Sequence, residues 1–103
     1  MLNTLSLAGL IPAIKVNNAG DAVPISKALM AGGLPVAEFT FRSDAAEEAI
    51  RLVRQELPDI LLGAGTVLTC DQADRAVRAG ARYIVTPGFN PKVVRHCLDK
   101  GYP

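Results

Sequence analysis

The chain has 103 residues, which is enough for one small domain with a modest hydrophobic core. Half of the residues are hydrophobic and a fifth are charged, so the composition is that of a folded globular protein. Eleven basic and ten acidic side chains leave a net charge near +1, and there is no tryptophan. This balance offers no basic surface for nucleic acid or for an acidic membrane, so we expect neither partner.

The first sixteen residues are apolar but carry no positive leader, and Lys15 interrupts the run. We therefore expect neither a signal peptide nor a membrane span. Cys70 and Cys97 lie far apart, without a CxxC pattern or a cluster of histidines. This spacing predicts reduced thiols, no metal site and a cytoplasmic protein.

Short apolar runs alternate with helical stripes four times along the chain. The expected strands are 11–16, 35–41, 59–66 and 81–88, and the expected helices are 21–32, 43–57, 71–79 and 91–100. Glycines are expected to end three of these helices and Pro58 the other, while Ser43 is the expected N-cap of the second. The buried stripes are expected at Ala22, Ile25, Leu29 and Met30 in the first helix and at Ala46, Ile50, Val53 and Leu57 in the second.

Repeated βα units predict a parallel sheet with right-handed crossovers. The strand "AEFTFR" is unusual because Glu38, Thr40 and Arg42 share one face, opposite Ala37 and Phe39. That polar face is either solvated or the lining of a site, and its place between apolar parallel strands favours the site. We therefore expect the first four units of a (β/α)8 barrel, with these groups near its carboxyl-terminal mouth, rather than an open doubly wound sheet.

Four units make half of such a barrel, whose open edge strands would be hydrophobic. Either two halves associate, or residues 1–103 are one N-terminal half of a longer domain, interrupted where a fifth strand would begin at Tyr102 and Pro103. We expect the second arrangement.

Three segments carry a resemblance to a known family: "GGLPVAEFTFR" at 32–42, "GAGTV" at 63–67 and "VTPGF" at 85–89. Together with "IPAIKV" and "DAVPISKALMAGG", they resemble the N-terminal half of the 2-keto-3-deoxy-6-phosphogluconate (KDPG) aldolases, also called KHG/KDPG aldolases. One departure is Phe39, where the family more usually has a smaller aliphatic residue. Phe39 is expected to face the helices, so this departure concerns packing.

The resemblance implies a class I aldolase on a (β/α)8 barrel, usually a homotrimer and without a metal or other cofactor. Such an enzyme cleaves KDPG to pyruvate and glyceraldehyde 3-phosphate through a lysine Schiff base. The implied partners are therefore pyruvate and 2-keto acid phosphates. Hydroxyglutarate and phosphogalactonate substrates remain open alternatives.

Within the resemblance, Glu38 matches the general acid/base that acts through a water, and Arg42 matches the group that holds the pyruvyl carboxylate. Thr66 matches a hydroxyl that positions substrate, and Thr40 lies between the first two. Pro87 belongs to the expected pocket wall, and Lys15 matches a basic position that assists substrate binding.

The Schiff-base lysine of the family lies on the sixth strand, beyond this chain. Lys15 is the lysine expected at the mouth, whereas Lys27, Lys92 and Lys100 are expected on helix surfaces. The chain therefore carries the proton-transfer groups and lacks the nucleophile.

Simpler interpretations accompany several of these residues. Taken alone, a threonine in the place of Thr66 is more often a helix N-cap than a substrate ligand, and "GAGT" lacks the GxGxxG pattern of a dinucleotide site. His96 on the last helix is expected to be structural. A non-catalytic half-barrel that assembles through its edges, or a remnant that binds a 2-keto acid through Arg42, are the alternatives to an aldolase.

Overall fold

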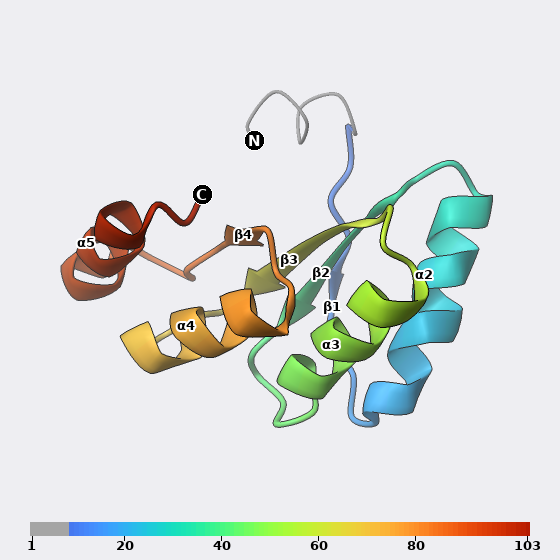
Figure 1. The fold of residues 1–103 in the computed structure, drawn as a ribbon, viewed down its shortest axis with the longest axis horizontal. Helices are drawn as coiled ribbons and strands as arrows, with labels where there is room; N and C mark the ends of the chain where they lie inside the picture. The colour runs from blue at the N-terminus through green and yellow to red at the C-terminus, as the bar shows by residue number, and fades with distance from the viewer. Residues whose placement is uncertain (1–8) are drawn as a thin grey trace.

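The computed structural model describes residues 9–103, which form one four-stranded parallel sheet with its helices on one side (Figure 1). The strands lie side by side in chain order, and at least one helix joins each strand to the next. The elements are β1 Ala13–Ile14, η1 Ala19–Asp21, α2 Ala22–Ala31, β2 Val36–Thr40, α3 Ala46–Glu56, β3 Leu61–Gly65, α4 Cys70–Ala79, β4 Tyr83–Ile84 and α5 Pro91–Lys100. The predicted sequence of four βα units is therefore confirmed.

The core lies between the sheet and the helices. Phe39 of β2 and Leu62 of β3 point into it and are fully buried against Ile50 and Val53 of α3. The expectation that Phe39 faces the helices is therefore confirmed. Because strand side chains alternate, the residues next to these on each strand point to the opposite face of the sheet.

Helix ends follow local signals in most places. Helix α5 spans the predicted residues, with Asn90 accepting from the backbone N–H of Lys92 at 3.1 Å and Gly101 in the left-handed conformation at φ 74°. Ser43, in contrast, is not an N-cap: α3 begins three residues later, after a turn in which the Ser43 carbonyl accepts from Ala46 N–H. The Ser43 hydroxyl makes no hydrogen bond to any group in the described part of the chain.

Two further predictions about packing are wrong in detail. In α2, Ala22 is buried as predicted, and Leu29 and Met30 are partly buried against the core. Ile25 is instead 37% exposed, and the other fully buried residue of this helix is Ser26. The outer strands are also shorter than predicted, with β1 and β4 only two residues long. β1 and β4 are the outermost strands of the sheet, so each pairs with a neighbouring strand on one side only in the described part of the chain.

The chain after α5 returns to the free side of β4. There the Ile84 N–H donates to the carbonyl of Pro103 at 3.0 Å, as it would to a neighbouring strand. Residues 1–8, which contain part of the apolar stretch considered above, lie outside the described residues. From residue 9 onward, no helix is long and apolar enough to cross a membrane.

Candidate active site

The sheet face that looks away from the helices carries a row of aligned residues. Glu38 of β2 is level with Gly63 of β3, and Gly63 is level with Tyr83 of β4. Equivalent positions on parallel strands point to the same side, so Glu38 and Tyr83 share this face with a glycine between them. Val36 and Leu61 form a small apolar cluster with Tyr83 on the same face.

Two glycines of β3 make room for these side chains. A β-carbon at Gly63 would overlap the ring of Tyr83, and one at Gly65 would overlap the carboxylate of Glu38. Glu38 therefore leans along its strand toward the carboxyl end, over Gly65, while the Tyr83 ring lies over Gly63. Glycine at these positions is required by close approach of side chains from the neighbouring strands.

Burial controls the electrostatics of this row. Glu38 is 9% exposed, and its burial raises the pKa of the carboxyl group, while the nearby Tyr83 hydroxyl partly offsets that increase. Burial, together with the negative charge of Glu38, raises the pKa of Tyr83 well above its usual value. Tyr83 thus remains a proton donor at all ordinary pH values, beside a carboxyl group that is more easily protonated than a solvated one.

Thr40 and Arg42 follow Glu38 toward the carboxyl end of β2. Thr40 is half-buried, and its hydroxyl donates to the Ile14 carbonyl of β1 at 3.5 Å, at the limit of a hydrogen bond. Arg42 is exposed, just beyond the strand. Among residues 9–103, no hydrogen bond or ion pair joins Arg42 to Glu38.

Thr66 follows β3 directly and has the positive φ of 54° that non-glycine residues rarely adopt. Such a conformation costs about 1–3 kcal/mol and is often found at functional sites. The adjacent Val67 N–H donates to the Val85 carbonyl at 3.1 Å, which fixes the turn against the loop after β4. The N-cap interpretation of Thr66 is wrong, because Thr69 caps α4 through the N–H of Gln72.

Lys15 and Pro87 complete the set at the same edge of the sheet. Lys15 is the first residue after β1, and Pro87 lies in the loop after β4; both are exposed. The parallel register thus brings all six predicted residues to the carboxyl-terminal half of the sheet, with Glu38 buried and Lys15, Arg42 and Pro87 outermost.

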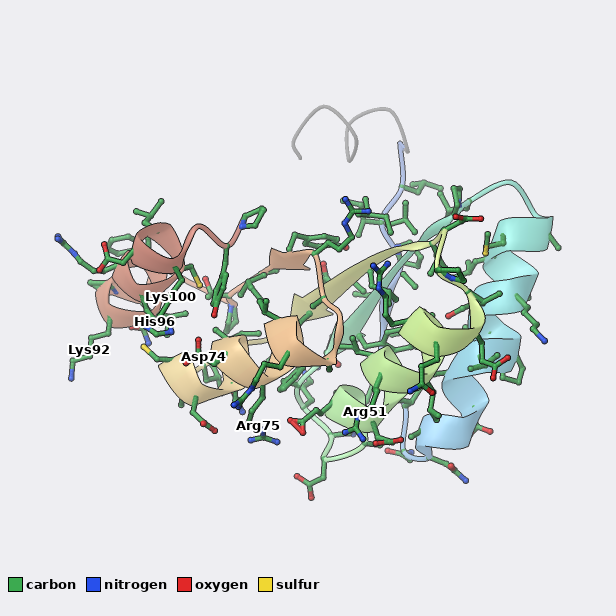
Figure 2. The ribbon with its side chains drawn as sticks, viewed as in Figure 1. Arg51, Asp74, Arg75, Lys92, His96 and Lys100 are labelled. Carbon is green, nitrogen blue, oxygen red and sulfur yellow. The ribbon has the colours of Figure 1, made fainter. Side chains whose placement is uncertain are left out.

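A cavity on the helix side of the described structure lies away from these residues. It has a volume of about 360 Å³ and lies between α3 and α4 on the outer surface, where Arg51 and Arg75 are visible in Figure 2. Arg75 is already paired with Glu47 at 2.8 Å, and Arg51 with Glu48 at 2.8 Å. This cavity contains none of the six predicted residues and is a gap between solvated helix surfaces.

Sequence reasoning missed Tyr83. The pattern over 81–88 predicts only an apolar strand, although a buried tyrosine needs a partner for its hydroxyl. Two registers together place Tyr83 in the row of Glu38, that of β2 with β3 and that of β3 with β4. His96 is structural, as expected, and bonds to Asp74 at 2.7 Å. In the described part of the chain, no group of three or more acidic, histidine or cysteine side chains could hold a metal ion.

Comparison with known proteins agrees with this arrangement and defines its class, half of a (β/α)8 aldolase barrel. An aldolase from Zymomonas mobilis that acts on 2-keto-3-deoxy-6-phosphogluconate superposes with a TM-score of 0.83 at 38% identity, over 88% of this chain and 44% of that one. A KDPG aldolase from Legionella pneumophila, solved with pyruvate captured as a covalent carbinolamine, gives a TM-score of 0.85 at 39% identity over 90% of this chain and 45% of that one.

The family model for KDPG and KHG aldolase matches residues 1–103, and the chain belongs to this family. The 2-dehydro-3-deoxy-phosphogluconate aldolase of Treponema pallidum is 50% identical over 103 residues, which are 100% of this chain and 49% of that protein. The KHG/KDPG aldolase of Escherichia coli K12 is 36% identical over 96% of this chain and 46% of its own length. The chain therefore spans about half the length of the curated relatives it matches.

Proposed function

We propose that this chain supplies the acid/base and carboxylate-binding part of a class I aldolase that cleaves KDPG to pyruvate and glyceraldehyde 3-phosphate. In this proposal residues 1–103 are the first four βα units of the catalytic domain. The observation that carries it is the burial of Glu38 on the face of the sheet opposite the helices, over Gly65. Glu38 has no basic partner among residues 9–103, and burying an unpaired carboxylate costs free energy that a purely structural role would not offset.

Glu38 has the properties of a proton-transfer group. Burial raises its pKa toward the pH at which it can both release and accept a proton. Formation of a carbinolamine, its dehydration to an imine and cleavage of the C–C bond each move a proton, and a water between Glu38 and substrate would carry it. General acid/base groups in such positions contribute about 10²- to 10⁴-fold to the rate.

The outer residues are proposed to bind substrate. Arg42 offers a planar guanidinium that pairs with the pyruvyl carboxylate through two parallel hydrogen bonds. The hydroxyls of Thr66 and Thr40 orient the substrate, with the strained turn at Thr66 holding its hydroxyl at the mouth. Lys15 supplies a positive charge for the anionic substrate, and Pro87 forms part of the pocket wall.

The nucleophile is proposed to come from the remaining part of the domain. An imine-forming lysine needs an apolar or cationic surrounding that lowers its pKa. Lys15 is exposed, and Lys27, Lys92 and Lys100 lie on helices. None of these four has the burial that imine chemistry requires.

The substrate range, assembly and compartment are part of the same proposal. The name of the E. coli relative includes KHG, which favours a second activity on 4-hydroxy-2-oxoglutarate. A structure described as native KDPGal, at 29% identity and a TM-score of 0.78, keeps the galactonate isomer open. We expect a cytoplasmic homotrimer, as the resemblance implies.

The test is borohydride trapping with pyruvate, read by intact mass, on the full-length gene product and on residues 1–103 in parallel. A pyruvyl adduct is expected on the full-length protein and none on the shorter chain. The Lys15→Arg variant should keep the adduct. Failure of the full-length protein both to form it and to cleave any 2-keto-3-deoxy acid phosphate would overturn the proposal. An adduct on the shorter chain would refute the placement of the nucleophile.

A non-catalytic role in assembly is the second candidate. Phe89 and Leu98, near the free side of β4, are 82% and 74% exposed, as expected of a surface that another element covers. Light scattering on residues 1–103 distinguishes the two candidates. A specific dimer would support assembly of half-barrels, and a folded monomer would argue against it.

A further inference from the structure

The Tyr83 hydroxyl is a buried polar group whose hydrogen bond is not accounted for. Tyr83 is 3% exposed, and its hydroxyl meets the geometry of a hydrogen bond with no other group in the part of the chain that the structure describes. A buried donor without an acceptor costs about 1–3 kcal/mol. A ring placed only to fill space would carry no hydroxyl, since phenylalanine fills the same volume without this cost.

The acceptor within reach is the Glu38 carboxylate. The two residues are two strands apart in one row, and the absence of a side chain at Gly63 opens the path between them. They are close enough that each changes the pKa of the other. No basic side chain pairs with Glu38 among residues 9–103. The Tyr83 hydroxyl is therefore the donor that the sheet places near this carboxylate.

We propose that Tyr83 is a positioning residue, whose O–H donates to the ionised Glu38 carboxylate and holds it over Gly65, facing the carboxyl end of the sheet. This inference rests on the proposed acid/base role of Glu38. A hydrogen bond to one carboxylate oxygen restricts rotation of the group. The other oxygen then remains free to form a hydrogen bond with a water at the carboxyl-terminal end of the sheet. The phenol does not itself exchange a proton with substrate.

The contact is linked to the protonation of Glu38. The ionised carboxylate accepts a strong, charge-assisted hydrogen bond, whereas the protonated form is a weaker acceptor. Tyr83 therefore favours the ionised form and opposes the effect of burial. Phenylalanine at this position would retain the ring over Gly63 and lose that opposition, so the pKa of Glu38 would rise further.

The test is the pH titration of the Glu38 side-chain carboxyl carbon by NMR, without substrate, in residues 1–103 and the Tyr83→Phe variant. The Glu38 titration should move to higher pH in the variant. The matched control is Tyr102→Phe, which removes a hydroxyl that donates to Asp74 at 2.9 Å. This control should leave the Glu38 titration where it is and move that of Asp74 upward.

A second measurement on the unsubstituted chain covers the case in which Tyr83→Phe does not fold. The Tyr83 ring carbon that bears the hydroxyl should show an inflection at the pH where Glu38 titrates, and Glu38→Gln should abolish it. An unchanged Glu38 titration in folded Tyr83→Phe, or a Tyr83 resonance that ignores Glu38, would overturn the inference. Neither measurement involves turnover. A protein without aldolase activity could therefore still give either result, and the two proposals can fail separately.

Discussion

Two carboxylates of this protein stand beside a tyrosine, and their surroundings push their pKa values in opposite directions. Glu38 is buried beside Tyr83 on the face of the sheet that looks away from the helices. Asp74 is a residue of α4 whose side chain meets His96 of α5, next to which Figure 2 shows it, and this side chain is 34% exposed. Burial raises the pKa of Glu38, whereas hydrogen bonds from His96 and then Tyr102 lower the pKa of Asp74.

The comparison shows that a neighbouring tyrosine does not by itself decide whether the pKa of a carboxyl group rises or falls. Tyr102 and His96 both bond to the same oxygen of Asp74, at 2.9 and 2.7 Å, and solvent also reaches the group. Asp74 is therefore a stable anion that ties two helices together. Glu38 is less exposed to solvent and has no positive partner among residues 9–103, so it is the carboxylate of the two that can readily change its protonation state.

The largest expected effect separates the two carboxylates by activity. In the full-length gene product, Glu38→Gln should lower kcat for KDPG cleavage by about 10²- to 10⁴-fold, because the amide cannot transfer a proton. The matched change Asp74→Asn, on the outer helices, should leave kcat nearly unchanged. Steady-state assay of pyruvate release measures both. Comparable losses in the two variants would mean that Glu38 acts through folding and not through chemistry.

The next effect concerns the space that lets Tyr83 approach Glu38. Gly63→Ala should destabilise the chain by about 1–3 kcal/mol, because the new methyl group overlaps the Tyr83 ring. Gly88→Ala is the control, since a β-carbon there meets no atom within 4 Å and should change stability by about 0.5 kcal/mol or less. Urea denaturation measures both free energies. Equal small changes would show that the ring of Tyr83 is free to move aside.

The sequence predicted much of this fold because strong local signals coincide with it. The helix predicted over 91–100, with a glycine at its end, is reproduced residue by residue as α5, which begins at Pro91 and is followed by Gly101. Alternation along "AEFTFR" also assigned Phe39 to the helices and Glu38 to the other face. Each of these predictions depends on residues that are neighbours in sequence, where periodicity and capping chemistry act directly.

The failures depend on contacts that no local pattern contains. Ser43 has the chemistry of an N-cap, but a turn intervenes before α3 and leaves its hydroxyl buried without a partner. Ile25 is apolar at a position that the packing of α2 turns outward, while Ser26 takes the buried place. Tyr83 lies in the row of Glu38 only because of the register of the three strands β2, β3 and β4. Register between strands is a tertiary property, so local sequence patterns do not predict that Tyr83 lies beside Glu38.

The smallest expected effect is the pH dependence of stability, where the two carboxylates should act with opposite signs. The folded pKa of Asp74 is lowered, so its contribution is present above the unfolded value of about 3.9 and is lost as the pH falls through the folded pKa. The folded pKa of Glu38 is raised, so stability declines as the pH rises from the unfolded value of about 4.3 through the folded pKa.

Urea denaturation between about pH 2.5 and pH 7 separates these contributions, because they occupy different windows around the unfolded values. Asp74→Asn should flatten the acid side of the profile, and Glu38→Gln should remove the decline on the less acidic side. The second change should also make the chain more stable near neutral pH, since a buried charge is replaced by a neutral amide of similar shape. If Glu38→Gln instead destabilised the chain near neutral pH, the carboxylate would be serving a structural bond, and Tyr83 would be the partner to examine.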